Sequence, residues 1–437
     1  MLKKAVTWIL YGIMICYIIF APYYLNNIFS EKFLENSSNE EWSGVITLWD
    51  VPRLTVNGSE FGWIKGRIAS YHKHHPNIHI ELRELHYEDN NAIAFAGALS
   101  DDHPDILPLF VNQELIPLDN AAPTTLFNIE KEAVHIQKEF LTTVTEKDIV
   151  WGVPVYYSTN VLIINKDLLQ SLGIKIPEEW TYANFNSLLK EINEKDVKNE
   201  IVPFDFYIEK GSYSYIPFLL SDGGTIFYEN KIDFYHESIL TGLKRLTVIK
   251  DTIDNLPANF GARSKNEVYN DFLNLKKTVI IAGNLSDINA VLRKQNAGSG
   301  FEFIVSPYPK SNNGDSVKFA DEIGAYVMMK TEDHSKQKAI QDFLAFLLEE
   351  ESQNSVEIMG KLPVITNYPY QFEQYKHLNQ LYSDTTVQVV PFYRNRSAID
   401  EEIQLQIKKY LIENQPSTET LYQMEQNIEK LINDGKY

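Results

Sequence analysis

The chain carries a long segment without charge close to its N-terminus. Ala5 to Leu25 form a run of 21 uncharged residues, which as an α-helix is about 31 Å long and reaches across the hydrocarbon core of a bilayer. Lys3 and Lys4 precede this run, and basic residues favour the cytoplasmic side of a membrane. We therefore predict one N-terminal transmembrane helix, with the chain that follows it outside the cell.

Three interpretations of this segment compete: an uncleaved anchor, a cleaved signal peptide and a lipoprotein signal. A cleaved signal ends in small residues of the A-x-A type, which Phe20-Ala21-Pro22 does not provide. A lipoprotein signal has small residues before its cysteine, whereas Ile13-Met14-Ile15 precede Cys16. We favour the uncleaved anchor. Residues 1–42 then form the anchor and a polar, flexible stalk, and the binding domain lies at the cell surface as a single-pass protein.

Length and charge limit what the exported part is and what it binds. With 437 residues the chain exceeds one compact core and fits two lobes. A net charge of −19 argues against a nucleic-acid partner, because an acidic surface repels phosphate groups. Cys16 is the single cysteine, so disulfides, cysteine zinc sites and a cysteine nucleophile are excluded.

Predicted strands alternate with predicted helices after the stalk. Val45–Trp49 is a short apolar run rich in β-branched residues, and Ile78–Leu82 alternates as a second strand. Helical spacing over Phe61–Tyr71 separates them, and Pro104–Leu107 begins a third strand. This order predicts an α/β fold with a βαβ sheet. Amphipathic helices are predicted further on, over Lys336–Leu348, Ile403–Ile412 and Leu421–Ile432.

One segment has the most specific local pattern in the chain. Trp151-Gly152-Val153-Pro154 predicts a turn, and a buried strand follows up to Asn165. A short helix from Lys166 is expected to end at Gly173, and a new helix begins after Thr181. Further motifs lie before and after it: Pro104-Asp105-Ile106, Leu115-Ile116-Pro117-Leu118-Asp119, Asp222-Gly223-Gly224, Phe343-Leu344-Ala345-Phe346-Leu347 and Gly360-Lys361-Leu362-Pro363.

Jointly and in this order the motifs resemble those of the extracellular solute-binding proteins of ABC importers, the sugar-binding, maltose-binding-protein-like family 1. Three departures from the family pattern stand out. Ile164 replaces a tyrosine, the order of Trp180-Thr181 is reversed, and Leu285 lies where the family has a tryptophan that stacks on sugar. The last departure weakens the expectation of a sugar ligand.

The resemblance implies a two-lobed periplasmic-binding-protein fold of type II with a ligand cleft between the lobes. Residues 43–155 with 308–350 are expected to form lobe 1. Residues 160–305 with 351–437 are expected to form lobe 2. The chain is expected to cross between the lobes at about Pro154–Asn160 and again near Ser306–Pro309.

The resemblance also implies which residues contact the ligand. A loop after the first strand carries three candidates, a hinge position carries Ser158, and a tyrosine matching a stacking position is Tyr213. Trp49, Asp50, Arg53 and Tyr213 also have a simpler interpretation, as a surface turn or a core residue. The predicted ligand-binding residues are Trp49, Asp50, Arg53, Ser158, Tyr213, Tyr215, Asn284, Glu322 and Tyr393.

No metal site or cofactor is expected. The histidines of the run from His72 to His79 offer a metal-ligand spacing, but they fit a solvated helix end. The chain has none of the common catalytic motifs, so we predict no enzymatic activity.

The predicted function is the extracellular substrate-binding component of an ABC importer. The chain would capture a sugar or oligosaccharide, as a monomer, and deliver it to permease subunits in the membrane. An anchored sensory receptor is the alternative, and a glycoside-acting enzyme is a remote one.

Overall fold

The computed structural model describes residues 42–86, 90–125, 136–228, 231–311, 317–366, 368, 370–373, 375–376, 378 and 387–434. The predicted anchor at residues 5–25 and the stalk up to residue 41 lie outside these ranges. Within them, no helix combines the length and the apolar character that crossing a membrane requires.

Seven strands form the first sheet, which contains the three strands predicted from the sequence. Parallel pairing joins β1 (Gly44–Asp50) to β2 (Ile78–Glu84) and to β3 (Ile106–Pro108). Antiparallel pairing joins β15 (Glu322–Met329) to β3, to β6 (Ala121–Ala122) and to β9 (Val153–Ser158). The order across the sheet is β16-β9-β15-β3-β1-β2, where β16 is Leu362–Pro363.

Helices cover both faces of this sheet. The alternation of β1 buries Ile46 and Leu48 completely. They pack in one cluster with Trp63 of α2 (Gly62–His74) and Phe343 of α11 (His334–Phe346). On the other face α3 (Asn90–Leu99) packs with Leu107 of β3 in a separate cluster. The sheet therefore lies between two layers, as its mostly apolar strands require.

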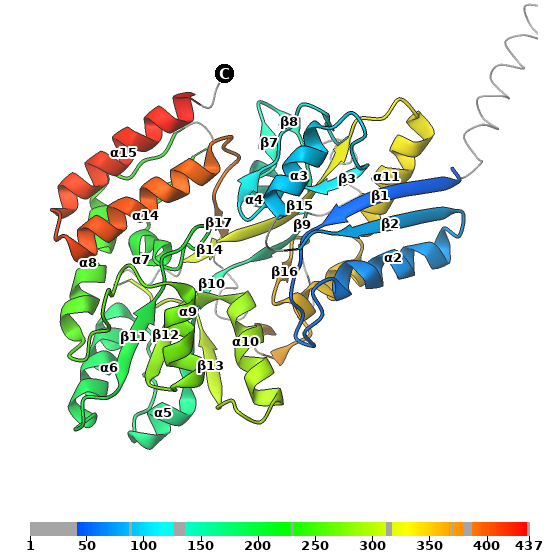
Figure 1. The fold of residues 1–437 in the computed structure, drawn as a ribbon. Coiled ribbons are helices and arrows are strands. Elements are labelled where there is room, and N and C mark those ends of the chain that lie inside the picture. Colours follow the sequence, from blue (N-terminus) through cyan, green and yellow to red (C-terminus); the bar gives the residue numbers. More distant parts are fainter. Residues whose placement is uncertain are drawn as a thin grey trace, which may run out of the picture.

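The second sheet has four strands in the order β11-β12-β10-β13. Their bounds are β10 Asn160–Asn165, β11 Val202–Phe206, β12 Thr278–Asn284 and β13 Phe303–Ser306. The helices of this half include α5 Lys166–Ser171, α6 Tyr182–Lys195, α7 Ile216–Leu220, α8 Glu237–Thr252, α9 Lys265–Tyr269, the π-helix η1 Asn270–Asn274 and α10 Leu285–Asn296. Figure 1 shows the two halves with β9, β10, β14 and β15 running between them.

Local capping explains the pattern that the sequence showed after β10. The Asn165 side chain accepts a hydrogen bond from the Leu168 amide at 3.0 Å and so begins α5. Gly173 ends this turn with a φ of 66°, which glycine adopts without strain. Thr181 caps α6 through the Asn184 amide at 3.2 Å. The predicted succession of strand, short helix and new helix is confirmed.

The chain crosses between the sheets at two neighbouring points. β9 ends at Ser158 and β10 begins at Asn160, so a single residue, Thr159, lies between the sheets. On the return, β14 (Lys318–Ala320) leads into β15 at Glu322. β14 pairs in parallel with β17 (Val387–Val389).

The C-terminal part of the chain is divided between the two halves. Helices α14 (Arg396–Ile412) and α15 (Ser417–Asp434) share a buried cluster with β10 and α8 of the second half. β16 instead pairs with β9, so this segment belongs to the first sheet. The assignment of all of 351–437 to lobe 2 needs this correction, because the segment completes the edge of the first sheet before the chain leaves it.

The return crossing needs a correction too. Tyr308 and Phe319 still pack in the cluster of the second half, so the chain returns to the first sheet between Ala320 and Glu322 and not near Ser306–Pro309. The other lobe boundaries stay a prediction.

Short elements complete the chain. They are β4 Phe110–Val111, β5 Glu114–Leu115, α4 Lys138–Thr142, β7 Thr145–Glu146, β8 Ile149–Val150, α12 Glu350–Asn354 and the 3₁₀ helix η2 Val356–Met359. β4 pairs with β5, and β7 pairs with β8, as two antiparallel hairpins.

Candidate ligand-binding cleft

A buried arginine forms the first part of a polar cluster at the crossings. Arg53 Nη1 lies 2.6 Å from Asp50 Oδ2 and donates to the Tyr326 hydroxyl at 3.3 Å. The Tyr326 hydroxyl donates to the same carboxylate oxygen at 2.9 Å, and Arg53 Nε donates to the Tyr156 hydroxyl. The Arg53 side chain is 9% exposed and that of Asp50 is fully buried. This network holds the charged end of β1 against β9 and β15.

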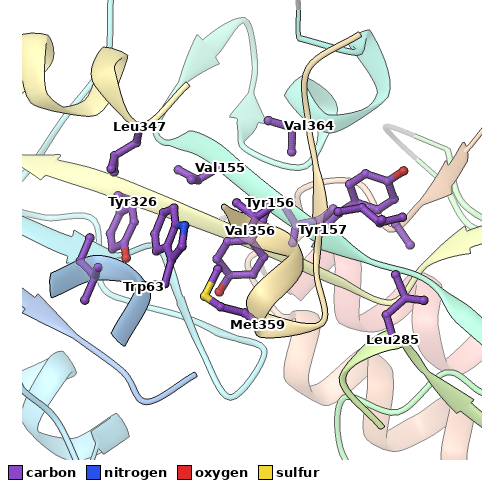
Figure 2. Packing of buried hydrophobic residues seen from close by; sticks show 14 of the residues in the cluster. Trp63, Val155, Tyr156, Tyr157, Leu285, Tyr326, Leu347, Val356, Met359 and Val364 are labelled. Atoms are coloured by element: carbon purple, nitrogen blue, oxygen red, sulfur yellow. The ribbon is translucent and has the colours of Figure 1, made fainter. Parts of the chain in front are cut away.

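Aromatic packing fixes the two tyrosines. Tyr156 and Tyr326 extend from neighbouring antiparallel strands into a hydrophobic cluster with Trp63 and Met359 (Figure 2). The rings of Trp63 and Tyr156 meet edge to face at 6.4 Å. Burial raises the pKa of both phenols, so they remain neutral at physiological pH. Burial alone lowers the pKa of Arg53, but the charge of Asp50 and the phenols raise it overall.

A lysine connects the two halves beside this network. The Lys361 ammonium contacts the Glu322 carboxylate at the start of β15. It also donates to the Ser286 hydroxyl at 2.6 Å, at the beginning of α10. Burial by itself raises the pKa of Glu322, but the charges of Lys361 and Arg53 bring it below its ordinary value. The Glu322 side chain keeps 28% of its surface exposed, so this carboxylate lies at an accessible part of the cluster.

An asparagine ties the second sheet to the return crossing. Asn284 Nδ2 donates to Asp321 Oδ2 at 2.7 Å, while its Oδ1 accepts from the Ser286 amide and caps α10. Asn160 Nδ2 approaches the same Asp321 oxygen at 3.4 Å. Burial and the neighbouring charge of Glu322 raise the pKa of Asp321 to about 6. Asp321 therefore changes charge close to neutral pH.

A second lysine contributes from the side of α9. Lys265 Nζ lies 2.7 Å from Asp287 Oδ1 and 5.4 Å from the ring centroid of Tyr207. The Tyr207 hydroxyl donates to Asp287 Oδ2 at 2.7 Å. Burial alone raises the pKa of Asp287, but the charge of Lys265 and these hydrogen bonds lower it below its usual range. The Lys265 side chain remains 36% exposed.

No cation of this cluster is left without a carboxylate. Arg53 pairs with Asp50, Lys361 with Glu322, and Lys265 with Asp287, while Asp321 is a fourth carboxylate. An anionic ligand would have to displace one of the paired carboxylates, which costs desolvation and a broken ion pair. Among the described residues, several buried oxygens of the cluster accept no hydrogen bond: Asp50 Oδ1, Ser158 Oγ, Asn160 Oδ1 and Asp321 Oδ1. The arrangement suits an uncharged ligand that carries hydroxyl donors.

Five of the nine predicted residues meet in this cluster. Asp50 and Arg53 are bonded to each other. Ser158 lies opposite Glu322 in the β9–β15 register, and Asn284 bonds to Asp321 next to Glu322. The structure thus brings together predicted positions that are up to 272 residues apart in the chain, from Asp50 to Glu322. Their contact with a ligand stays a prediction.

Trp49 lies on the opposite face of β1 from this cluster. Neighbouring residues of a strand point to opposite faces, so burying Asp50 at the crossing turns Trp49 away. Its ring lies under the Arg83 guanidinium at 4.2 Å and against Gly97 of α3. With Thr47, Glu81 and Arg83 it lines a shallow surface hollow. This placement matches the simpler interpretation of a structural tryptophan.

The three predicted tyrosines of the second half are also separate from the cluster. Tyr213 is 1% exposed and donates to Asp400 of α14. Tyr215 is fully buried, and the Tyr393 hydroxyl donates to the Tyr228 carbonyl. All three predicted residues belong to the hydrophobic cluster of the second half. They occupy core positions, which matches the simpler interpretation of Tyr213 as a lobe-core residue.

Sequence reasoning missed several members of the cluster, among them Tyr326, Lys265 and Lys361. Tyr326 and Lys265 lie in segments without a recognisable motif. Lys361 stands inside the Gly-Lys-Leu-Pro turn, where a cation among apolar residues was a usable signal. Within the described ranges, no group of three or more His, Cys, Asp or Glu residues is arranged to hold a metal ion.

Two sheets joined by adjacent crossings, with a polar cluster at the crossings, define a two-lobed binding protein. Residues 57–354 match the family described as bacterial extracellular solute-binding protein. The chain belongs to this family, and the predicted resemblance is confirmed. No curated relative matches the sequence.

Solved structures share the fold over almost the whole chain. One is the cyclic alpha-maltosyl-1,6-maltose binding protein from Arthrobacter globiformis, with a TM-score of 0.70, 16% identity, and coverage of 90% of this chain and 100% of that one. The GacH receptor of Streptomyces glaucescens, solved unliganded and with acarbose, has a TM-score of 0.65 at 19% identity, covering 91% and 100%. A solute-binding protein from Thermotoga lettingae bound with alpha-D-tagatose has a TM-score of 0.68 at 16% identity, covering 89% and 100%. At these identities the likeness establishes the two-lobed fold.

Proposed function

We propose that this chain is the extracellular substrate-binding component of an ABC importer, which captures a carbohydrate at the crossings between its lobes and delivers it to a membrane permease. It binds its ligand and performs no chemistry on it. The proposal keeps residues 5–25 as an uncleaved membrane anchor that holds the binding domain outside the cell.

The observation that carries the proposal is that each cation of the polar cluster is already paired with a carboxylate. The three buried or half-buried ion pairs, with Asp321 as a fourth carboxylate, leave no unpaired cation to attract an anionic ligand. Carboxylate and amide oxygens without a partner remain as acceptors, including Asp50 Oδ1 and Asp321 Oδ1. Sugar hydroxyls are uncharged donors and match such acceptors. Family membership and sugar-binding neighbours such as the tagatose-bound protein support the same ligand class.

A thermal-shift screen of the full chain in detergent tests the ligand class. Neutral mono- and oligosaccharides are compared with amino acids and short peptides at matched concentrations. A ligand present at 100 times its Kd adds about 2.7 kcal/mol to the free energy of unfolding. We expect at least one saccharide to stabilise the chain. Stabilisation by amino acids or peptides, with none by any saccharide, overturns the carbohydrate proposal. Incubation of the stabilising saccharide with the chain should return it unchanged.

Arg53→Lys provides the matched variant for this screen. Lysine keeps the positive charge beside Asp50 but cannot reproduce the guanidinium contacts to both Tyr326 and Tyr156. We expect the variant to fold and to bind the stabilising saccharide at least tenfold more weakly, or about 1.4 kcal/mol. Lys73→Arg on the exposed side of α2 is the control and should bind as the unmodified chain does.

A further inference from the structure

A hairpin of the first half reaches the second half at a distance from the polar cluster. β4 and β5 are joined by Asn112 and Gln113, whose φ angles of 49° and 65° make a tight two-residue turn. The hairpin meets two parts of the second half, the loop at Lys210–Gly211 and the start of α14. These contacts therefore bridge the halves independently of the crossing strands.

Ion pairs form the outer layer of this bridge. The Lys210 ammonium contacts the Glu114 carboxylate of β5 and lies 3.5 Å from Glu401 of α14. The other oxygen of Glu114 accepts from Asn91 Nδ2 at 2.8 Å, and the Ser397 hydroxyl of α14 lies 3.5 Å from the oxygen that Lys210 contacts. Glu114 is thus shared by α3 and the second half.

Close packing forms the inner layer. Gly211, at a φ of +73°, lies so near Gln113 that an added Cβ would be 2.6 Å from that side chain. The Arg396 guanidinium lies 5.4 Å from the ring centroid of Phe110, and Arg396 is only 2% exposed. A glycine at 211 lets the loop approach the hairpin without a steric clash.

The bridge lies next to the segment of the second half that contains Tyr213, the tyrosine predicted to stack on a sugar. Tyr213 follows Gly211 by two residues, is 1% exposed and is bonded to Asp400, one helical turn after Arg396. The outer ion pair of the bridge is as exposed as the crossings: Lys210 and Glu114 keep 38% and 26% of their side-chain surface, and Lys265 and Glu322 keep 36% and 28%. The two halves are therefore closed against each other at the inner layer, where Arg396 and Tyr213 are buried.

We propose that the contact of hairpin β4–β5 with Lys210, Gly211 and α14 is a clamp that closes one end of the cleft and restricts the ligand to a short saccharide. A saccharide chain cannot run through the clamp, so only one that ends before it is accommodated. This inference rests on the proposed function for the ligand class. The clamp itself depends on the contacts alone.

Charge reversal tests the clamp without any ligand. Spin labels on Lys73→Cys of α2 and Lys244→Cys of α8, in a full chain with Cys16→Ser, report the distance between the halves. Glu114→Lys places two cations against each other and should lengthen or broaden this distance. The exchange Glu114→Lys with Lys210→Glu should restore the original distribution. Glu191→Lys, which disrupts the Glu191–Lys195 pair within α6, should leave it unchanged.

An unchanged distance in Glu114→Lys overturns the clamp, as does a lengthened distance that the exchange does not restore.

Calorimetric titration with glucose, maltose, maltotriose and maltoheptaose tests the length limit. In the unmodified chain we expect maltoheptaose to bind no more tightly than maltotriose. In Glu114→Ala we expect maltoheptaose to bind at least tenfold more tightly than maltotriose. Maltoheptaose that binds the unmodified chain tenfold more tightly than maltotriose overturns the limit. If no saccharide binds here or in the thermal-shift screen, the proposed function fails, while the label distances still decide the clamp.

Discussion

The Thr159 hydroxyl donates a hydrogen bond of 2.8 Å to the backbone carbonyl of Phe319. Thr159 is the single residue between β9 and β10, and Phe319 belongs to β14 on the return path. The bond therefore joins the two crossings directly. Because both residues are almost fully buried, no solvent replaces the bond when it is lost.

Thr159→Val should destabilise the fold at this joint. Valine has nearly the same shape but leaves the Phe319 carbonyl without this donor, which costs about 1–3 kcal/mol. Urea unfolding followed by circular dichroism measures the loss. Thr241→Val on the exposed side of α8, where the hydroxyl donates to Glu237 at 3.0 Å, is the control and should change stability by less than about 0.5 kcal/mol. Equal effects of the two variants would contradict a special role of the joint.

Arg53→Met should be the most destabilising single change in the polar cluster. It leaves the fully buried Asp50 carboxylate without its ion-pair partner, and an unpaired buried charge costs about 3–5 kcal/mol. Adding Asp50→Asn should recover part of this loss, because the remaining group is then neutral. Chemical denaturation of the two single variants and the double variant measures the coupling. Strictly additive losses would show that the two side chains do not act as a pair.

Asp321 should make stability fall as pH rises. Its folded pKa of about 6 lies above the value of about 3.9 in an unfolded chain, so the folded state holds the proton more tightly. Its contribution is therefore complete at pH below about 4 and is lost as pH rises through about 6. The free energy of unfolding of Asp321→Asn, relative to that of the unmodified chain, should be about 1 kcal/mol higher at pH 8 than at pH 5. Urea midpoints at both pH values check this, and a difference of opposite sign would refute it.

The fold could be predicted largely because its signals are local. Alternation over β1 and the caps at Asn165 and Thr181 depend on residues a few positions apart. The same holds for Asp50 at the end of β1 and Arg53 in the loop after it, which bond to each other. Ser158 and Glu322 were predicted from their positions in the family resemblance, and the structure places them opposite each other in the β9–β15 pair.

The remaining site residues depend on contacts that the sequence does not announce. Lys361 joins Glu322 to Ser286 only because β16 returns to the edge of the first sheet. Tyr213 is buried by α14, whose Asp400 lies 187 positions further along the chain. The local sequence pattern around Tyr213 marks an aromatic position, but it carries no information about the packing of α14 over that tyrosine.

The burial of Tyr213 changes what its replacement should do. Tyr213→Ala removes a ring that packs against Phe319 at 5.6 Å and leaves Asp400 without its donor. We expect a loss of about 3–5 kcal/mol in the free energy of unfolding. Tyr213→Phe keeps the ring and loses the hydrogen bond, so about 1–2 kcal/mol is expected. Denaturant unfolding measures both variants.

Ligand titration of Tyr213→Phe separates a core role from a binding role. Burial raises the pKa of Asp400 to about 6, so in this variant the cost of its lost donor should be smaller at pH 5, where the carboxyl is protonated, than at pH 8. A core role predicts this pH-dependent loss of stability together with unchanged affinity for the saccharide found in the thermal-shift screen. Unmodified stability with binding at least tenfold weaker would instead place the Tyr213 hydroxyl at the ligand, and the sealed end of the cleft would then have to open when the ligand binds.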